Sequence, residues 1–159
     1  MDFKAILVAT DFSECAGAAF KMAKSLAQVF GAKLILLHVI HQTVMVQVAE
    51  HLKVQPESLL PEFRKEAQRQ LDDFLEEYGS GGLEVTNMVT AGIPFQEIAV
   101  IARDLAVDLI VMGGYGRSGR GPIEEVFFGS TSEKVVRLLP CPVLCVPWEG
   151  LEKAEEAPG

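Results

Sequence analysis

The glycine-rich stretch over residues 113–133 contains the residues of this sequence best suited to binding an anion. It reads GGYGRSGRG and, after PIEEVFF, continues as GSTSE. Glycines let backbone N–H groups converge on an anion because no Cβ stands in the way. A helix that starts at Ser130 would add free N–H donors and the positive end of its dipole. The stretch therefore indicates a phosphate site that needs no basic surface.

Two interpretations without a ligand fit the same residues. Residues 130–133 (STSE) have the spacing of a capping box, in which Ser130 accepts a hydrogen bond from the N–H of Glu133. Glycines also occur in ordinary mobile loops. A GxGxxG pattern is present at Gly114, Gly116 and Gly119, but it follows the fourth predicted strand instead of opening the first βαβ unit. We therefore do not expect a dinucleotide site.

Asp11 ends the first predicted strand, where its carboxylate could accept a hydrogen bond from a base or from a sugar hydroxyl. The alternative is that Asp11 or Ser13 caps the helix that follows, since Asp11 and Glu14 also have capping-box spacing. The sequence leaves both possibilities open. His38 lies inside an apolar run and is expected to be a core histidine with satisfied hydrogen bonds, whereas His41 is expected on a loop or at the surface.

Alternating strands and helices must position these residues. Continuous apolar runs predict buried strands over residues 4–9, 34–39 and 108–112. A short apolar run predicts a last strand at the sheet edge over 142–147, and an alternating pattern predicts a half-exposed edge strand over 83–90. Spacings of three and four predict helices that end near residues 30, 78, 105 and 138, the first with one face formed by Ala18, Met22, Leu26 and Val29. Residues 41–57 fit either a strand or a short helix.

The pattern predicts an α/β fold, a single-domain open parallel sheet of five strands with helices on both faces. A chain of 159 residues has the size of one domain. Sheets of this kind bind ligands outside the carboxyl ends of their strands, where the strand order reverses. The segments expected at that edge are residues 9–13, 39–41, 90–94 and 112–131.

Composition argues against two classes of partner. The chain has 14 Lys and Arg against 22 Asp and Glu, a formal charge of −8, which is the wrong sign for binding a nucleic-acid backbone or an anionic membrane. No apolar run approaches the roughly 18–20 residues of a membrane span, and no leader segment precedes the first strand. We therefore expect a cytoplasmic protein with no nucleic-acid and no membrane partner.

The three cysteines fit a reducing compartment. Cys141 and Cys145 are four residues apart in a predicted strand, about 13 Å at the strand rise, which is too far for a disulfide. We expect both, and Cys15, to be small hydrophobic core residues.

Common catalytic motifs are missing from the sequence. It contains no GxxxxGK[ST], GxSxG, HExxH or HxGH pattern, and its Ser, His and Asp residues have no spacing that indicates a triad. We expect little or no enzymatic turnover.

Several segments together resemble the universal stress protein family: ILVATDFSE, LILLHVI, AGIPFQEIAVIA, DLIVMGGYGRSG and GSTSEKVVRLLPCPVLCVP. The resemblance covers residues 3–147 as one domain. It implies a Rossmann-like nucleotide-binding fold with strand order 3-2-1-4-5 and a regulatory role in the stress response. Residues 148–159 form an acidic tail that we expect to be frayed.

Family members that bind ATP share a glycine pattern: Gly, two residues, Gly, nine residues, then Gly followed by Ser or Thr. Gly113 and Gly116 match its first part, and Gly129 with Ser130 matches its end. The resemblance implies an adenine nucleotide, ATP or AMP or ADP. The base and ribose would lie beside Thr10, Asp11 and the backbone of Val39. Met112, Gly113 and Gly116 would lie along the ribose and phosphates. The phosphate chain would contact Gly129, Ser130 and Thr131. Because the site is poor in lysine, Mg²⁺ or Mn²⁺ is expected beside the phosphates, and at most slow ATP hydrolysis, for which the sequence offers no convincing base.

This chain departs from the family pattern in two places. Twelve residues, 117–128, separate the second and third glycines where the pattern has nine, and Ala9 stands where ATP-binding members often have proline.

The resemblance also implies a homodimer through the last strand, which runs from Pro142 to Pro147. The alternative is a dimeric interaction module that binds no nucleotide, in which the longer loop and the apolar segment 41–57 form a partner surface.

Overall fold

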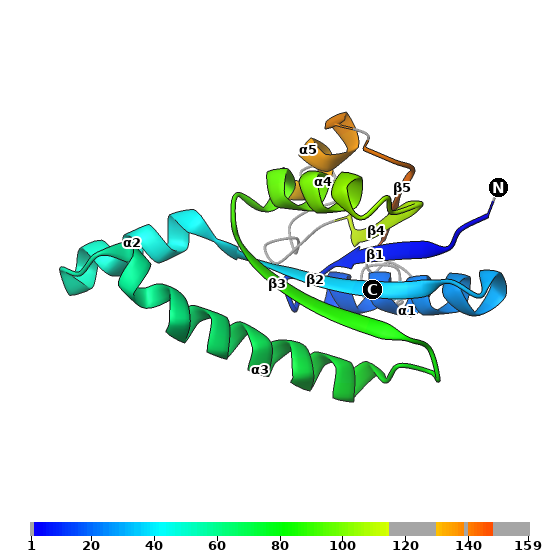
Figure 1. Cartoon of the computed structure of the whole chain (residues 1–159), viewed down its shortest axis with the longest axis horizontal. Coiled ribbons are helices and arrows are strands. Elements are labelled where there is room, and N and C mark those ends of the chain that lie inside the picture. Colours follow the sequence, from blue (N-terminus) through cyan, green and yellow to red (C-terminus); the bar gives the residue numbers. More distant parts are fainter. Residues whose placement is uncertain (1, 115–129, 139, 148–159) are drawn as a thin grey trace, which may run out of the picture.

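A computed structural model describes residues 2–114, 130–138 and 140–147. Our predictions for Gly116, Gly129 and the tail of residues 148–159 lie outside the described residues. Within them, five parallel strands form one sheet in the order β3-β2-β1-β4-β5 (Figure 1). The strands are β1 (Ala5–Ala9), β2 (Lys33–His41), β3 (Val85–Gly92), β4 (Leu109–Gly113) and β5 (Val143–Val146). The predicted fold class and strand order are confirmed.

Helices cover both faces of the sheet. Two of them, α1 (Glu14–Phe30) and α3 (Leu60–Tyr78), pack on one face, and α4 (Pro94–Asp104) and α5 (Ser130–Leu138) pack on the other (Figure 1). The three central strands are buried on both sides, which explains their continuous apolar runs. At the carboxyl ends of β1 and β4 the chain changes from one half of the sheet to the other, so the strand order reverses there.

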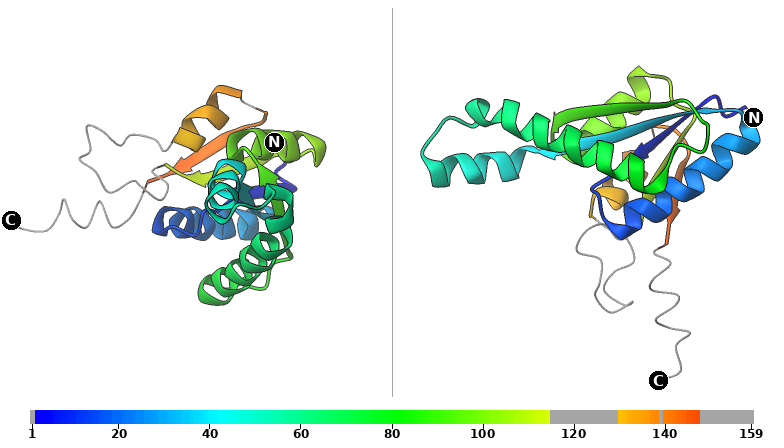
Figure 2. Two further views of the ribbon diagram at one scale, coloured as in Figure 1. Left: turned by 90° about the vertical axis from the view of Figure 1, so that its left-hand side faces the viewer. Right: turned by 90° about the horizontal axis from the view of Figure 1, so that it is seen from below.

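The segment that the sequence left open is helical: α2 (Gln42–Leu52), followed by the short 3₁₀ helix η1 (Pro56–Leu59). The pairing of β2 with β3 ends at His41 and Gly92. The strand β3 therefore offers no pairing partner to Val44, Val46 and Val48, whose alternation had suggested a strand. The His41 side chain caps α2 by accepting a hydrogen bond from the N–H of Thr43 (3.2 Å). Figure 2 shows α2 and the first part of α3 extending well beyond the sheet.

The predicted buried face of α1 is partly wrong. Val29 is 78% exposed and Met22 is 43% exposed. The buried face is instead formed mainly by small residues and one ring: Cys15, Ala16, Gly17, Ala18, Ala19, Phe20, Ala23 and Ala27. Alanines contribute little to a hydrophobicity pattern, yet they let a helix lie close to a sheet.

The two edge strands of the sheet are β3 and β5, as the sequence predicted. The strand β3 is half-buried along its length, as its alternating pattern predicted. At the opposite edge, β5 pairs with β4, in the register Met112 to Cys145.

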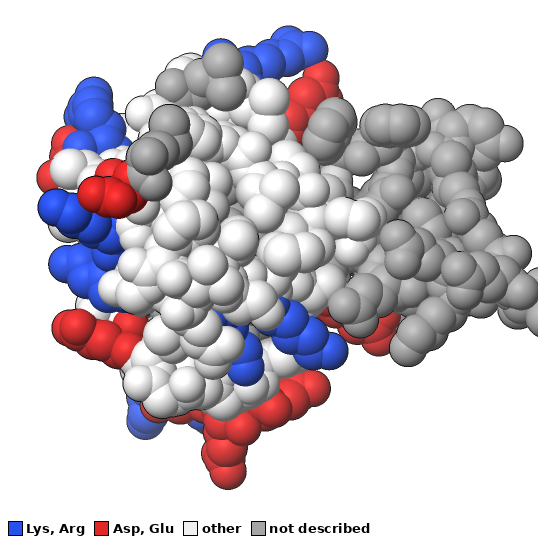
Figure 3. All heavy atoms as spheres, turned by 90° about the vertical axis from the view of Figure 1, so that its right-hand side faces the viewer, with Lys and Arg blue, Asp and Glu red and all other residues white. Residues whose placement is uncertain are grey.

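No helix in the described ranges is long and apolar enough to cross a membrane. On the face seen in Figure 3, acidic and basic side chains lie interspersed around a broad uncharged area.

No disulfide joins the three cysteines, as predicted. Cys15 is buried in α1, and Cys141 and Cys145 are half-buried against the core between the sheet and α4. Burial raises the pKa of the Cys141 thiol and of the Cys145 thiol above the usual value.

Alkylation by iodoacetamide should therefore be slow at neutral pH. Only the thiolate reacts, so a raised pKa moves the rise in rate to a higher pH than in free cysteine. Single variants Cys141→Ser and Cys145→Ser would assign the two sites by mass spectrometry. A rate at pH 7 that equals that of free cysteine would contradict this expectation.

Candidate functional site

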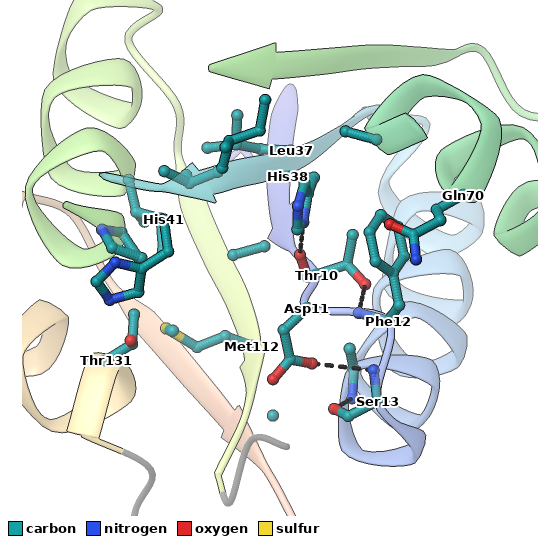
Figure 4. A pocket seen from close by; sticks show the side chains of 18 of the residues that line it. Thr10, Asp11, Phe12, Ser13, Leu37, His38, His41, Gln70, Met112 and Thr131 are labelled. Atoms are coloured by element: carbon teal, nitrogen blue, oxygen red, sulfur yellow. Dashed lines mark hydrogen bonds between the residues drawn. The ribbon is translucent and has the colours of Figure 1, made fainter. Parts of the chain in front are cut away.

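A cavity of about 500 Å³ opens where the strand order reverses, at the carboxyl ends of β1, β2 and β4 (Figure 4). Its volume lies within the roughly 300–1,000 Å³ of small-molecule sites. The segment after β1 forms one wall, the first turn of α5 another, and side chains from α2 and α3 close a third side. The cavity therefore lies at the edge where ligands of open parallel sheets bind.

The structure brings six of the nine predicted site residues around this cavity: Thr10, Asp11, Val39, Met112, Gly113 and Thr131. Ser130 is the first residue of α5, next to the cavity wall. The remaining two, Gly116 and Gly129, are not among the described residues.

The segment between β1 and α1 shows that Ser13, and not Asp11, caps the helix. Ser13 is the N-cap of α1, and its Oγ accepts a hydrogen bond from the N–H of Ala16 (3.2 Å). Asp11 Oδ1 accepts from the N–H of Ser13 (3.0 Å), which closes a local turn. A capping box between Asp11 and Glu14 is wrong, because Glu14 is the first residue of the helix.

The second carboxylate oxygen of Asp11 points away from the Ser13 bond, toward the side of the cavity where Met112 lies (Figure 4). Among the described residues, no hydrogen bond or ion pair engages this oxygen. Asp11 thus uses one oxygen to hold its own turn and presents the other to the cavity as an acceptor.

The start of α5 is tied to the end of β4. Ser132 is buried, and its Oγ donates a hydrogen bond to the carbonyl oxygen of Gly113 (2.6 Å). Sequence reasoning missed Ser132, because only the fold brings it beside β4. The predicted capping box places Ser130 before the helix, whereas α5 begins at Ser130, and the Glu133 carboxylate accepts a hydrogen bond from Arg137 (2.8 Å).

The first turn of α5 faces the cavity with Thr131 and Ser132. The N–H groups of a helix's first turn have no partner within the helix, and they carry the positive end of its dipole. This wall can therefore stabilise an anion without a basic side chain.

Gly113 is required by packing as well as by its place at the cavity. A Cβ at this position would lie 2.8 Å from the carbonyl carbon of Cys15, a backbone atom at the start of α1. A Gly113→Ala substitution is expected to lower the free energy of unfolding by about 1–3 kcal/mol, the usual cost of overpacking. Equilibrium urea unfolding measures it. An unchanged free energy of unfolding with weakened ligand binding would instead mean that the glycine serves the ligand alone.

The described cavity lining has four ionisable side chains, Asp11, His38, His41 and Glu66, and no Lys or Arg. The hydrogen bond from Arg69 lowers the pKa of Glu66, so this carboxylate is already engaged. In the part of the chain that the structure describes, no group of three or more His, Cys, Asp or Glu could hold a metal ion. An anion here would depend on backbone N–H groups.

Several further lining residues were not foreseen. Phe63 and Ala67 lie on the apolar face of α3, and both line the cavity. His38 faces the cavity, and its Nδ1 lies 2.8 Å from the carbonyl oxygen of Thr10. His41, which belongs to a segment expected at this edge, lines the cavity and caps α2. The periodicity that placed these residues on a helix or strand carried no signal of a neighbouring cavity.

The fold is that of a Rossmann-like α/β protein, and a cavity of small-molecule size lies at the reversal point of its open parallel sheet. An acceptor carboxylate, a closely packed glycine and a helix start surround this cavity. More specifically, the chain belongs to the universal stress protein family, whose model matches residues 2–147.

Two curated relatives illustrate the match. Universal stress protein MJ0577 of Methanocaldococcus jannaschii is 33% identical over 156 residues, which cover 91% of this chain and 94% of the relative. Universal stress protein YxiE of Bacillus subtilis is 33% identical over 149 residues, which cover 91% of this chain and 99% of the relative.

Solved structures share the fold. The structure of MJ0577 aligns with a TM-score of 0.77 at 33% identity and covers 92% of this chain and 97% of that chain. Two more distant universal stress proteins were solved in complex with a nucleotide. One holds cAMP and aligns with a TM-score of 0.60 at 21% identity, covering 94% of this chain and 100% of that chain. The other, from Archaeoglobus fulgidus, holds dAMP and aligns with a TM-score of 0.62 at 20% identity, covering 92% of this chain and 99% of that chain.

Proposed function

We propose that this protein binds an adenine nucleotide, ATP or its relatives ADP and AMP, in the cavity at the reversal point of the sheet, and that it acts as a regulatory stress protein with little or no turnover. One observation carries the proposal: an acceptor oxygen of Asp11 and the first turn of α5 face the same cavity. The first suits ribose hydroxyls or a base amino group, and the second suits phosphates.

The charge of the cavity supports a nucleotide held by backbone groups. With no Lys or Arg in the described lining, the phosphate charge would be offset by N–H groups of α5 and of the glycine-rich segment. In this proposal Thr10 and the backbone of Val39 flank the base and ribose, and Met112 and Gly113 follow the ribose. Gly116, Gly129, Ser130 and Thr131 take the phosphates.

A divalent cation fits this arrangement in a particular way. Since the described residues offer no ligand cluster, Mg²⁺ or Mn²⁺ would be held chiefly by phosphate oxygens and water, as Mg²⁺ often is in nucleotide sites. Its contribution would be to neutralise phosphate charge. The cAMP and dAMP complexes of distant family members support the proposal only to the extent that the same fold holds adenine nucleotides there.

The proposal extends to assembly and location. We propose a homodimer through the edge strand β5, whose outer side has no strand partner among the described residues, in a cytoplasmic protein whose domain spans residues 3–147. Sedimentation equilibrium tests the dimer, which should dissociate when proline replaces Leu144.

The direct test is calorimetric titration of nucleotide-free protein with ATP, ADP and AMP, with and without Mg²⁺, with GTP and CTP as controls for the base. We expect saturable binding of adenylates, and a rise in melting temperature equivalent to about 2.7 kcal/mol at a ligand concentration of 100 Kd. Mass spectrometry of small molecules released on denaturation would show what the protein carries. No binding and no melting shift with any adenylate would refute the proposal.

That negative result would favour a second function, an interaction module that binds no nucleotide. The observation behind it is the segment around α2, which extends beyond the sheet (Figure 2) and leaves Val44, Leu52 and Val54 exposed. Apolar side chains that a monomer leaves exposed in this way are typical of partner surfaces.

A further inference from the structure

The turn that presents Asp11 contains an unfavourable backbone conformation. Phe12 has a φ of 67°, in the left-handed region that side chains other than glycine rarely adopt. Such a conformation costs roughly 1–2 kcal/mol in an L-residue and persists only where surrounding contacts impose it. Some feature of the structure must therefore hold the residue beside Asp11 in place.

The imidazole of His38, on the neighbouring strand β2, provides one such contact. Its Nδ1 lies 2.8 Å from the carbonyl oxygen of Thr10. A carbonyl oxygen can only accept, so Nδ1 carries the proton and donates it. Thr10 is also fixed on its other side, since its N–H donates to the carbonyl oxygen of Leu37 (2.9 Å) and its Oγ1 accepts from the N–H of Phe12 (3.0 Å).

The ring of Phe12 provides the second contact. It lies against the His38 imidazole, with centroids 4.4 Å apart and planes inclined by 31°. On another side it meets Phe74 of α3 edge-on at 6.1 Å. The strained residue is thus held between β2 and α3 by its side chain, while its backbone N–H is held by Thr10.

These contacts fix the residues on both sides of Asp11, and Asp11 Oδ1 is bound to Ser13. We propose that His38 is a positioning residue of the nucleotide site: through Thr10 and Phe12 it holds the turn in the one conformation that directs the free oxygen of Asp11 into the cavity. The proposal rests on the proposed function. The surrounding run of β2 is apolar and His38 is half-buried within it, so its imidazole N–H needs a hydrogen-bond partner there.

Two variants separate the parts of this contact. His38→Phe keeps a ring against Phe12 but removes the N–H donor, and His38→Asn keeps a donor near the position of Nδ1 but removes the ring. We expect His38→Phe to weaken ATP binding about tenfold, the usual weight of one hydrogen bond. His38→Asn should restore most of that loss.

A local readout on ligand-free protein distinguishes positioning from general stability. Hydrogen exchange measured by NMR should show the amide protons of Phe12 and Ser13 exchanging about tenfold faster in His38→Phe, while amides in the central strands keep their protection. His38→Asn should return Phe12 and Ser13 toward wild-type rates.

The outcomes separate this proposal from the function on which it rests. If wild-type protein binds no adenylate, the proposed function fails, and the exchange rates still decide whether His38 holds the turn. If His38→Phe lowers only the melting temperature, with affinity and the two exchange rates unchanged, the proposal is overturned. The same holds if His38→Asn fails to recover either quantity. If His38→Phe does not fold, His38→Leu replaces it in both experiments. Wild-type affinity and wild-type exchange rates in His38→Leu would then overturn the proposal, whereas weaker ATP binding and faster exchange would support it.

Discussion

Replacing Asp11 by asparagine is expected to weaken ATP binding by about 10- to 100-fold, which corresponds to the roughly 1.5–3 kcal/mol of a hydrogen bond to a charged group. Asparagine keeps the Oδ1 that accepts from the N–H of Ser13, so the turn can persist. It replaces the second oxygen, which faces the cavity, with an NH₂ group that can only donate. A ribose hydroxyl or base amino group would then meet a donor. Isothermal titration calorimetry measures the loss.

Ser13→Ala is the matched control for this substitution. It removes the N-cap of α1, at a cost of about 1 kcal/mol in stability, but leaves the Asp11 carboxylate and the Ser13 backbone N–H in place. Its affinity for ATP should stay within threefold of wild type. Unchanged affinity in Asp11→Asn, together with normal folding, would show that Asp11 serves only the turn and that the nucleotide lies elsewhere.

Phe20→Ala is expected to lower the free energy of unfolding by about 3–5 kcal/mol, the range for deleting a buried phenyl ring. Phe20 is fully buried between α1, α3 and the sheet. Its ring meets Phe74 at 5.5 Å and Tyr78 at 6.2 Å, both edge-on. Truncation would leave a cavity between the two helices that neighbouring side chains cannot fill. Equilibrium unfolding in urea, followed by circular dichroism, gives the difference.

Val29→Ala on the same helix is the control. Val29 is 78% exposed, so its truncation should change the free energy of unfolding by no more than about 0.5 kcal/mol. The periodicity of α1 placed Val29 on the buried face and did not single out Phe20. A large effect at Val29 and a small one at Phe20 would therefore support the face that the sequence indicated over the face seen in the structure.

The sheet was predictable because its central strands are buried on both sides. Such strands appear in a sequence as unbroken apolar runs, and β1, β2 and β4 were each located to within two residues. The end of β2 was placed too early, at Val39, because its extension to His41 depends on pairing with β3. The face of α1 was misjudged for a similar reason, since contact with the sheet and with α3, and not hydrophobicity alone, selects which residues are buried.

The candidate site was predictable in its location but not in its details. The rule that ligands bind at strand ends pointed to Asp11 and Gly113. Whether Asp11 capped the helix depended on backbone angles, and the structure gives that task to Ser13. The contacts of His38 and Ser132 at the cavity were not predicted, because each side chain bonds to a carbonyl that is distant in the sequence. Contacts of that kind leave no periodic signal.

The hairpin of α2, η1 and the start of α3 also bears on how chain length can vary in this protein. Its tip, the connection between α2 and η1, lies far from the sheet (Figures 1 and 2), while its base contributes Val44 and Phe63 to the cavity. Insertions or deletions at the tip are expected to leave every strand register unchanged, whereas changes at the base are expected to alter the shape of the cavity. The same hairpin thus combines a tip at which changes in length should be tolerated with a base that shapes the candidate site.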